Sequence, residues 1–273
     1  QQSLKIFFDQ WVFQKGAPRF YLDAVQARDT GSTWKIEGRI VQESPQYIFD
    51  LDLLLESQGR TDSKTIRISD KETPFQITSE SRPLSLVADP ASQIMRRLFP
   101  IEIPPAINAI KSSSAVLTVL SADLEPQVKS AARTLMLSLG LKNYAFAAEK
   151  NINHEQILDR DILMIGYPQD KALLRSLPDH VTVNPKSFIL NEKTYEQPSD
   201  VFFGVFAHPF SENRIAALFL PLSSHQAENV ARKITHYGKY SYLAFENGQN
   251  RAKGFWPIEQ SPLEHRWKEA MED

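Results

Sequence analysis

The sequence predicts an α+β protein with two domains: an N-terminal antiparallel β-sandwich over residues 1–110, then a three-layer α/β domain with a mostly parallel sheet over residues 111–273. Two patterns lead to this prediction. Apolar and polar residues alternate early in the chain, whereas later apolar runs are continuous and flank an amphipathic helix. The length of 273 residues also exceeds the roughly 100–150 residues of a common domain.

Residues 20–87 show the two-residue period of half-buried strands, as in the run that contains Phe49, Leu51 and Leu53. Turn-forming residues separate such runs at positions 29–32, 43–45, 57–59 and 69–70. Several short strands at this spacing, without a convincing long helix, predict an antiparallel sandwich. The apolar stretch 4–13 before them is either the first strand of the sandwich or a surface that packs against a preceding domain.

The pattern changes at residues 89–111, where we expect a linker. Pro100, Pro104 and Pro105 fall within six residues, and such a density of proline excludes a continuing helix or a central strand. We expect the linker to end near the serines at 112–114 and the second domain to begin at 111.

Apolar runs at 115–120, 144–148 and 162–165 predict strands that are buried on both faces. A helix is expected between the first two, because Pro126 suits a first helical position, Gly140 suits a stop, and the apolar residues between them have helical spacing. Strand, helix, strand is the parallel crossover unit, so a right-handed doubly wound sheet is the default.

Beyond Pro178 the expected elements are shorter. They are a hairpin over 186–195, an antiparallel strand pair over 201–207 and 215–222, a helix from Ser223 or Ser224, and a strand over 240–245. The charged tail 261–273 is expected to be helical or frayed.

Composition excludes several function classes. A net charge of -2 provides no field that attracts nucleic acid, and no apolar run approaches the roughly 20 residues of a membrane span. The absence of cysteine excludes disulfides and thiolate chemistry, and leaves the compartment open between cytoplasm and periplasm. Because Gln1-Gln2-Ser3 has neither a Met nor a signal-peptide pattern, we expect a piece of a longer protein.

The standard catalytic and metal motifs are incomplete. His154-Glu155 begins a zinc-protease helix, but Leu158 stands where the second His is needed, so both residues are expected to be exposed. Gly238-Lys239 lacks the first Gly of a phosphate loop. The strand ending at Leu120 is not followed by a glycine-rich turn. Asp50 and its neighbour Asp52 alternate with apolar residues, as on a solvated strand face. We therefore predict no catalytic residue and no metal or other cofactor in this chain.

Two groups of residues are candidates for ligand binding. Ser121, Tyr167 and His208 follow predicted strands, and ligands of open α/β sheets collect beyond the carboxyl ends of the strands; Arg214 lies near His208 in sequence. The second group lies in a segment rich in Tyr, Gly and basic residues: His236, Lys239, Tyr240, Asn247 and Lys253. The alternative is structural, with a hydrogen-bonded His208, tyrosines that cover a sheet edge, and glycines that shape a helix stop and a turn.

Two stretches resemble a known family. They are Phe8-Asp9-Gln10-Trp11-Val12-Phe13-Gln14-Lys15-Gly16-Ala17-Pro18, and Asp89-Pro90 with Arg96-Arg97-Leu98 and Glu102-Ile103-Pro104-Pro105. The first is similar to the segment that links the catalytic domain of M1-family zinc aminopeptidases to the β-sandwich after it, and the second to the end of that sandwich. The resemblance covers about residues 6–110. It implies that the zinc-binding catalytic domain would precede this chain and that zinc is expected only there.

Three hypotheses for function follow. The chain is a non-catalytic accessory region that supports an upstream peptidase-like domain or another partner, or its α/β domain binds a small molecule, a peptide or a glycan. A hydrolase of unfamiliar type that uses His208 or His236 is the third hypothesis. Residues 111–273 match no accessory domain of the family, so their function rests on their own pattern.

Overall fold

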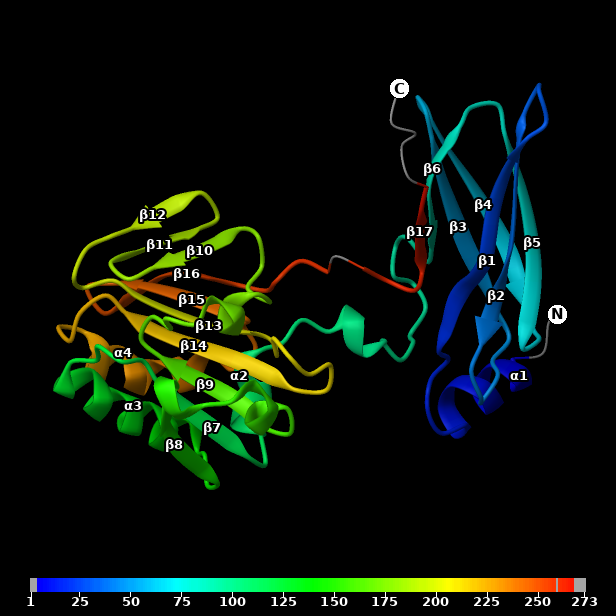
Figure 1. The fold of residues 1–273 in the computed structure, drawn as a ribbon. Helices are drawn as coiled ribbons and strands as arrows, with labels where there is room; N and C mark the ends of the chain where they lie inside the picture. Colours follow the sequence, from blue (N-terminus) through cyan, green and yellow to red (C-terminus); the bar gives the residue numbers. More distant parts are fainter. Residues whose placement is uncertain (1–3, 259, 268–273) are drawn as a thin grey trace. The chain divides into compact units, whose positions relative to one another are not determined.

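The computed structural model describes residues 4–258 and 260–267. They divide into two compact units: unit 1 has the residues up to Ile103 and those from Ile258 onward, and unit 2 is Pro104–Pro257. The described chain is mostly β structure, with antiparallel sheets in both units and one mixed sheet in unit 2 (Figure 1).

Unit 1 is built from two antiparallel sheets. One has the strand order β1-β2-β5 and the other β17-β6-β3-β4. The bounds are β1 Phe20–Asp29, β2 Trp34–Gln42, β3 Phe49–Ser57, β4 Arg60–Ile68, β5 Glu72–Ser79, β6 Pro83–Ala88 and β17 Glu264–Arg266. The core between the sheets includes Ile36, Leu51 and Leu53, each with no exposed surface.

The alternation seen in the sequence places these side chains. On β3 the leucines at every second position point into the core, and Asp50 faces outward to pair with Arg67 on β4 at 3.0 Å. The predicted solvated face for Asp50 is therefore confirmed.

The last strand of the sandwich comes from the C-terminal end of the chain, where a helical or frayed tail was expected. β17 pairs antiparallel with β6, and Leu263, only 4% exposed, packs into the core of unit 1. The second domain therefore does not extend to the C-terminus, because burial of Leu263 draws the chain back to the sandwich. Residues 268–273 lie outside the described residues.

The boundary between the units also differs from the expected 110/111. The short helix α2, Ile107–Lys111, belongs to unit 2, since Ile107 and Ile110 are fully buried in its core. The Ile107 N–H also donates to the Tyr240 carbonyl at 2.9 Å. The linker thus ends earlier than predicted, near Ile103.

Unit 2 contains a seven-stranded sheet of order β16-β15-β13-β14-β9-β7-β8 and a small antiparallel sheet β10-β11-β12. The bounds are β7 Val116–Leu120, β8 Tyr144–Ala148, β9 Asp161–Ile165, β10 Val181–Asn184, β11 Ser187–Leu190, β12 Lys193–Tyr195, β13 Val201–Ala207, β14 Ile215–Pro221, β15 Tyr242–Glu246 and β16 Gln249–Gly254. Three neighbouring pairs of the large sheet are parallel and three are antiparallel. The expectation of a mostly parallel sheet was wrong, because the chain adds β13, β15 and β16 through antiparallel pairing.

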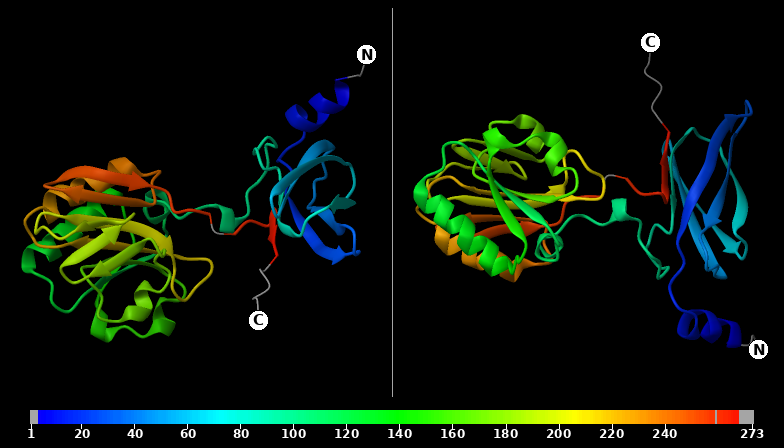
Figure 2. Two further views of the ribbon diagram at one scale, coloured as in Figure 1. Left: turned by 90° about the horizontal axis from the view of Figure 1, so that it is seen from above. Right: turned by 60° about the horizontal axis from the view of Figure 1, so that its bottom comes forward.

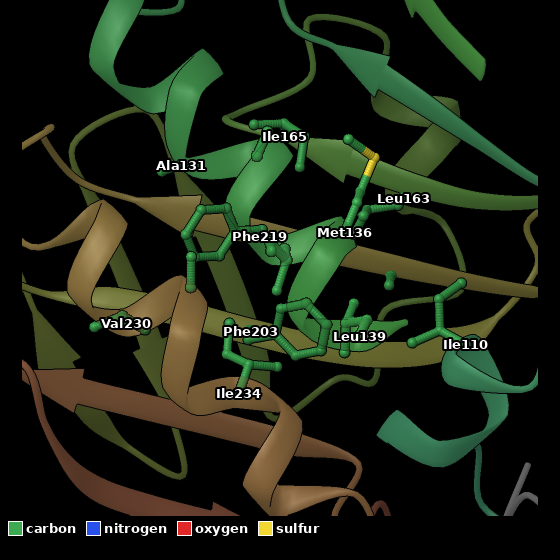
Figure 3. Close-up of a cluster of buried hydrophobic side chains, with 14 of the residues drawn as sticks. Ile110, Ala131, Met136, Leu139, Leu163, Ile165, Phe203, Phe219, Val230 and Ile234 are labelled. Carbon is green, nitrogen blue, oxygen red and sulfur yellow. The ribbon is translucent and has the colours of Figure 1, made fainter. Parts of the chain in front are cut away.

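Helices α3, Pro126–Leu139, and α4, Ala227–Lys233, lie on one face of the large sheet, and the small sheet lies over the other (Figure 2). Figure 3 shows the helix side of this packing, where Ala131 and Met136 of α3 meet Phe219 and Leu163 of the strands. The predicted α3 is confirmed, with Gly140 at φ 74° as its stop. α4 begins at Ala227, later than the expected Ser223 or Ser224.

β8 departs from its prediction. It forms an edge of the large sheet, and Tyr144 and Phe146 on it are 39% and 41% exposed. An apolar run thus identified the strand correctly but not its burial on both faces, because burial depends on how many neighbouring strands pair with it.

One buried carboxylate ties the two ends of unit 1 together. Glu102, 3% exposed, accepts hydrogen bonds from the Arg96 guanidinium at 2.7 and 2.8 Å, the Phe99 N–H at 2.8 Å and the Ser261 hydroxyl at 2.6 Å. Burial alone would raise the pKa of Glu102, but these hydrogen bonds and the Arg96 charge hold the pKa below its ordinary value.

We expect Glu102→Gln to destabilise unit 1 at pH 7 by roughly 3–5 kcal/mol, the usual cost of leaving a buried partner charge unpaired. Because the pKa of Glu102 is lower in the folded chain, its contribution is complete above the unfolded-state value of 4.5 and is lost progressively as the pH falls from 4.5 through the lower folded-state pKa. Urea unfolding at pH values on both sides of 4.5 measures this.

The matched control is Glu37→Gln, which removes an exposed carboxylate paired with Lys35 on the same sandwich. Little change is expected there. An equal loss for the two variants, or a Glu102→Gln effect independent of pH, would contradict the assignment.

Candidate functional site

The main candidate site of unit 2 lies where three adjacent parallel strands end. Leu120 of β7 and Phe219 of β14 flank Ile165 of β9 in the sheet register. The ladder continues for one step past the strands, since the Ser121 N–H donates to the Ile165 carbonyl and the Gly166 N–H to the Phe219 carbonyl. The three chain segments therefore leave the sheet side by side beyond the carboxyl ends of these strands, the usual ligand position in open α/β sheets.

A cavity of about 260 Å³ opens at this edge, and we call it the cleft. It is lined by segments after β7, after β9, between β10 and β11, and at the end of β14. The lining residues are Ser121, Asp123, Leu124, Glu125, Val128, Gly166, Tyr167, Gln169, Pro185, Lys186, Leu220, Pro221, Leu222 and Ser223. Two of the predicted ligand residues, Ser121 and Tyr167, are brought together here.

The wall of the cleft is formed by a close approach of two strand ends. Gly166 has φ +78°, and a Cβ added to it would lie 2.5 Å from both Ser121 Oγ and Leu124 Cδ2. Ser121 is 9% exposed, and its hydroxyl has no hydrogen-bond partner in the described part of the chain. Because Ser121 borders the cleft, a ligand at this wall could form a hydrogen bond with its hydroxyl.

Charged groups surround the opening. Asp123 and Glu125 precede α3, whose first residue is Pro126 and which has no side-chain cap. Lys186 is contributed by the turn between β10 and β11. The Tyr167 hydroxyl contacts the Lys171 ammonium, which also lies over the tyrosine ring at 3.6 Å from its centroid.

His208 lies at the opposite end of the strands from the cleft, not in the cleft as the sequence suggested. β13 runs antiparallel to β14, so that Ala207 at its end pairs with Ile215 at the start of β14. His208 is 4% exposed; its Nδ1 accepts from the Phe210 N–H, and burial lowers its pKa. Arg214 is near it, and its carbonyl accepts from the His208 N–H.

The predicted segment rich in Tyr and Gly forms a separate aromatic cluster. The Lys253 ammonium lies 5.5 Å from the Tyr237 ring centroid and 5.3 Å from that of Tyr240, and Lys239 lies 5.2 Å from the latter. His236 is exposed in the short 3-10 helix Ile234–Tyr237. These residues lie beside the start of β15 and the end of β16, away from the cleft.

Asn247 and Gly248 make the turn between β15 and β16, at φ 49° and 71°. Two consecutive positive φ angles at an Asn-Gly pair are typical of a tight hairpin turn. The structural interpretation thus explains Asn247 without a ligand.

A second surface lies on unit 1, at the N-terminal segment. This segment is helical, as α1 Lys5–Phe8 and a π-helical turn Asp9–Phe13, so of the two alternatives for it the first strand was wrong. We call its exposed apolar side chains the N-terminal apolar surface: Leu4 at 65% exposed, Phe7 at 54%, Phe8 at 46%, Val12 at 58% and Phe13 at 74%.

The segment is fixed to the sandwich by its opposite side. The Gln10 amide donates to the Ile48 carbonyl at 2.8 Å and accepts from the Ile48 N–H at 2.6 Å, as a neighbouring strand would. The Trp11 ring packs on Tyr47 with 5.2 Å between centroids. With Gln10 and Trp11 turned inward, the apolar residues before and after them are left on the outside.

Across residues 4–258 and 260–267, no three His, Asp or Glu side chains come together as a possible metal-ligand set. No helix within the same residues is long and apolar enough to cross a membrane. A comparison with protein-family models and one with curated proteins both give no match.

Sequence reasoning missed several residues of the cleft. Asp123 and Glu125 lie next to Ser121 and follow a predicted strand, so the same argument that selected Ser121 could have included them. Lys186 gave no such signal, because the small sheet that places it is a tertiary arrangement.

We expect Gly166→Ala to destabilise unit 2 by more than the about 1–2 kcal/mol that a left-handed conformation costs an L-residue. The added methyl group would meet Ser121 and Leu124. Gly140→Ala is the matched control, since Gly140 has φ +74° but no atom within 4 Å of an added Cβ. Thermal unfolding compares the two variants, and equal losses would contradict the close approach at the cleft.

Proposed function

We propose that this chain is a non-catalytic interaction region of a larger M1 aminopeptidase-like protein, and that unit 1 docks on a preceding peptidase-like domain. The observation that supports this most strongly is the N-terminal apolar surface, held to the sandwich through Gln10. We also propose that residues 6–110 correspond to the β-sandwich that follows the catalytic domain in that family, and that unit 2 is a three-layer domain.

Single exposed apolar residues are common, but a concentration such as Phe7, Phe8 and Phe13 within one short helical segment marks an interaction site. Full burial of one such side chain contributes about 1.5–3 kcal/mol. Because Gln10 and Trp11 already hold the segment in place, docking would not have to order it first.

We expect the backbone amides of residues 4–13 to exchange hydrogen more slowly when the preceding domain is joined to this chain than in the chain alone. The double variant Phe7→Ser and Phe13→Ser should remove that protection, because both side chains are exposed and available for docking. It should leave the melting temperature of the isolated chain nearly unchanged. Hydrogen exchange followed by mass spectrometry measures both states.

Leu137→Ser is the control, because Leu137 is 70% exposed on α3 of unit 2. It should not affect exchange at residues 4–13. Identical exchange with and without the preceding domain would contradict the docking proposal. Zinc-dependent cleavage of an aminoacyl arylamide by this chain alone would contradict its non-catalytic part.

A second function is supported by the cleft: unit 2 as a binding module for a small ligand. The unpartnered hydroxyl of Ser121 at a carboxyl edge of the sheet favours it. This role is independent of the docking surface, which belongs to unit 1.

We expect a thermal-shift screen of nucleotides, sugars, amino acids and short peptides to yield at least one class that stabilises unit 2. A ligand that binds only the native state contributes about 2.7 kcal/mol at 100 times its Kd. For a unit of this size, each kcal/mol of stabilisation raises the melting temperature by roughly 2–4 °C. A flat response across all classes would contradict the ligand-binding role.

A further inference from the structure

The size of the cleft limits its ligand. Its volume is about 260 Å³, below the roughly 300–1,000 Å³ of pockets that hold drug-sized molecules. A dinucleotide or an oligosaccharide chain would not be enclosed. A molecule of the size of one amino acid suits the space.

The charges around the cleft favour a cationic group on the ligand. Asp123 and Glu125 provide two carboxylates and Lys186 one ammonium, and none of the three is paired with another side chain in the described residues. Neither acidic side chain caps α3, so the helix does not account for them. The two carboxylates directly before α3 disfavour a phosphate group at the start of this helix.

The remaining lining supplies a hydroxyl and an apolar wall. Ser121 lines the cleft beside Gly166, and its hydroxyl has no hydrogen-bond partner within the described residues. Leu124, Val128 and Leu222 provide apolar contacts. The cleft thus combines carboxylates, one ammonium, one free hydroxyl and an apolar wall around a small volume.

We propose that the cleft binds a free α-amino acid with an apolar side chain, as a zwitterion. The ligand ammonium lies by Asp123 and Glu125, its carboxylate accepts from Ser121 and Lys186, and its side chain packs against the apolar wall. This inference rests on the ligand-binding role proposed for unit 2 and specifies its ligand. It does not depend on the docking of unit 1.

Calorimetric titration of the full chain with four probes tests the proposal: L-leucine, leucinamide, 4-methylpentanoate and inorganic phosphate. L-leucine should bind most tightly. Leucinamide lacks the carboxylate, and 4-methylpentanoate lacks the ammonium. The affinity of each should be lower than that of L-leucine by a factor of about ten or more, which is the effect of losing a hydrogen bond to a charged group. Phosphate should not bind.

Variants place the binding in the cleft. The double variant Asp123→Asn and Glu125→Gln should weaken L-leucine binding about tenfold or more while leaving the melting temperature of the free chain unchanged. Ser121→Ala should also weaken it. The control is Glu155→Gln with Glu212→Gln, which removes two exposed carboxylates that do not line the cleft and should leave the affinity unchanged.

The outcomes separate the ligand class from the binding role. Tighter binding of phosphate or 4-methylpentanoate than of L-leucine would overturn the proposal that the ligand is a zwitterionic amino acid. The ligand-binding role of unit 2 would still stand. L-leucine binding that the cleft variants do not change would place it elsewhere and overturn the proposal. No binding of any probe also overturns it, and a flat response in the wider screen would then overturn the binding role as well.

Discussion

The direction of β14 determines how the strand ends of unit 2 are arranged. β14 runs parallel to β9 but antiparallel to β13, so the strand pairing changes from parallel to antiparallel at β14. On one side of it, the ends of β7, β9 and β14 meet at one edge and form the cleft. On the other side, β13 ends at the opposite edge. One strand direction therefore decides which polar residues share a site and which do not.

Much of the fold could be predicted because its signals are local. The alternation around Leu51 and Leu53 identifies a sandwich strand, and Pro126 at the start and Gly140 at the stop define α3. Both signals are local because neighbouring residues determine the backbone conformation and the burial pattern. The site was predicted less well. Ser121 and the cleft agree with the strand-end argument, but His208 does not, because the direction of β13 depends on pairing with distant strands.

The end of the sandwich had no local signal either. β17 is three residues long, and only its pairing with β6 and the burial of Leu263 make it a strand. Glu102 accepts hydrogen bonds from Arg96 and from Ser261, so residues before and after unit 2 in the chain meet at one buried carboxylate of unit 1. Unit 2 is in effect inserted between two strands of the sandwich. The two proposed activities accordingly reside in different units, docking in unit 1 and ligand binding in unit 2.

Amide chemical shifts during titration with L-leucine would locate the binding site of unit 2, which we place at the ends of β7, β9 and β14. We predict shifts concentrated at the lining residues, above all at Ser121, Gly166 and Tyr167. Shifts concentrated instead around His208, or in the aromatic cluster of Tyr237 and Tyr240, would contradict it.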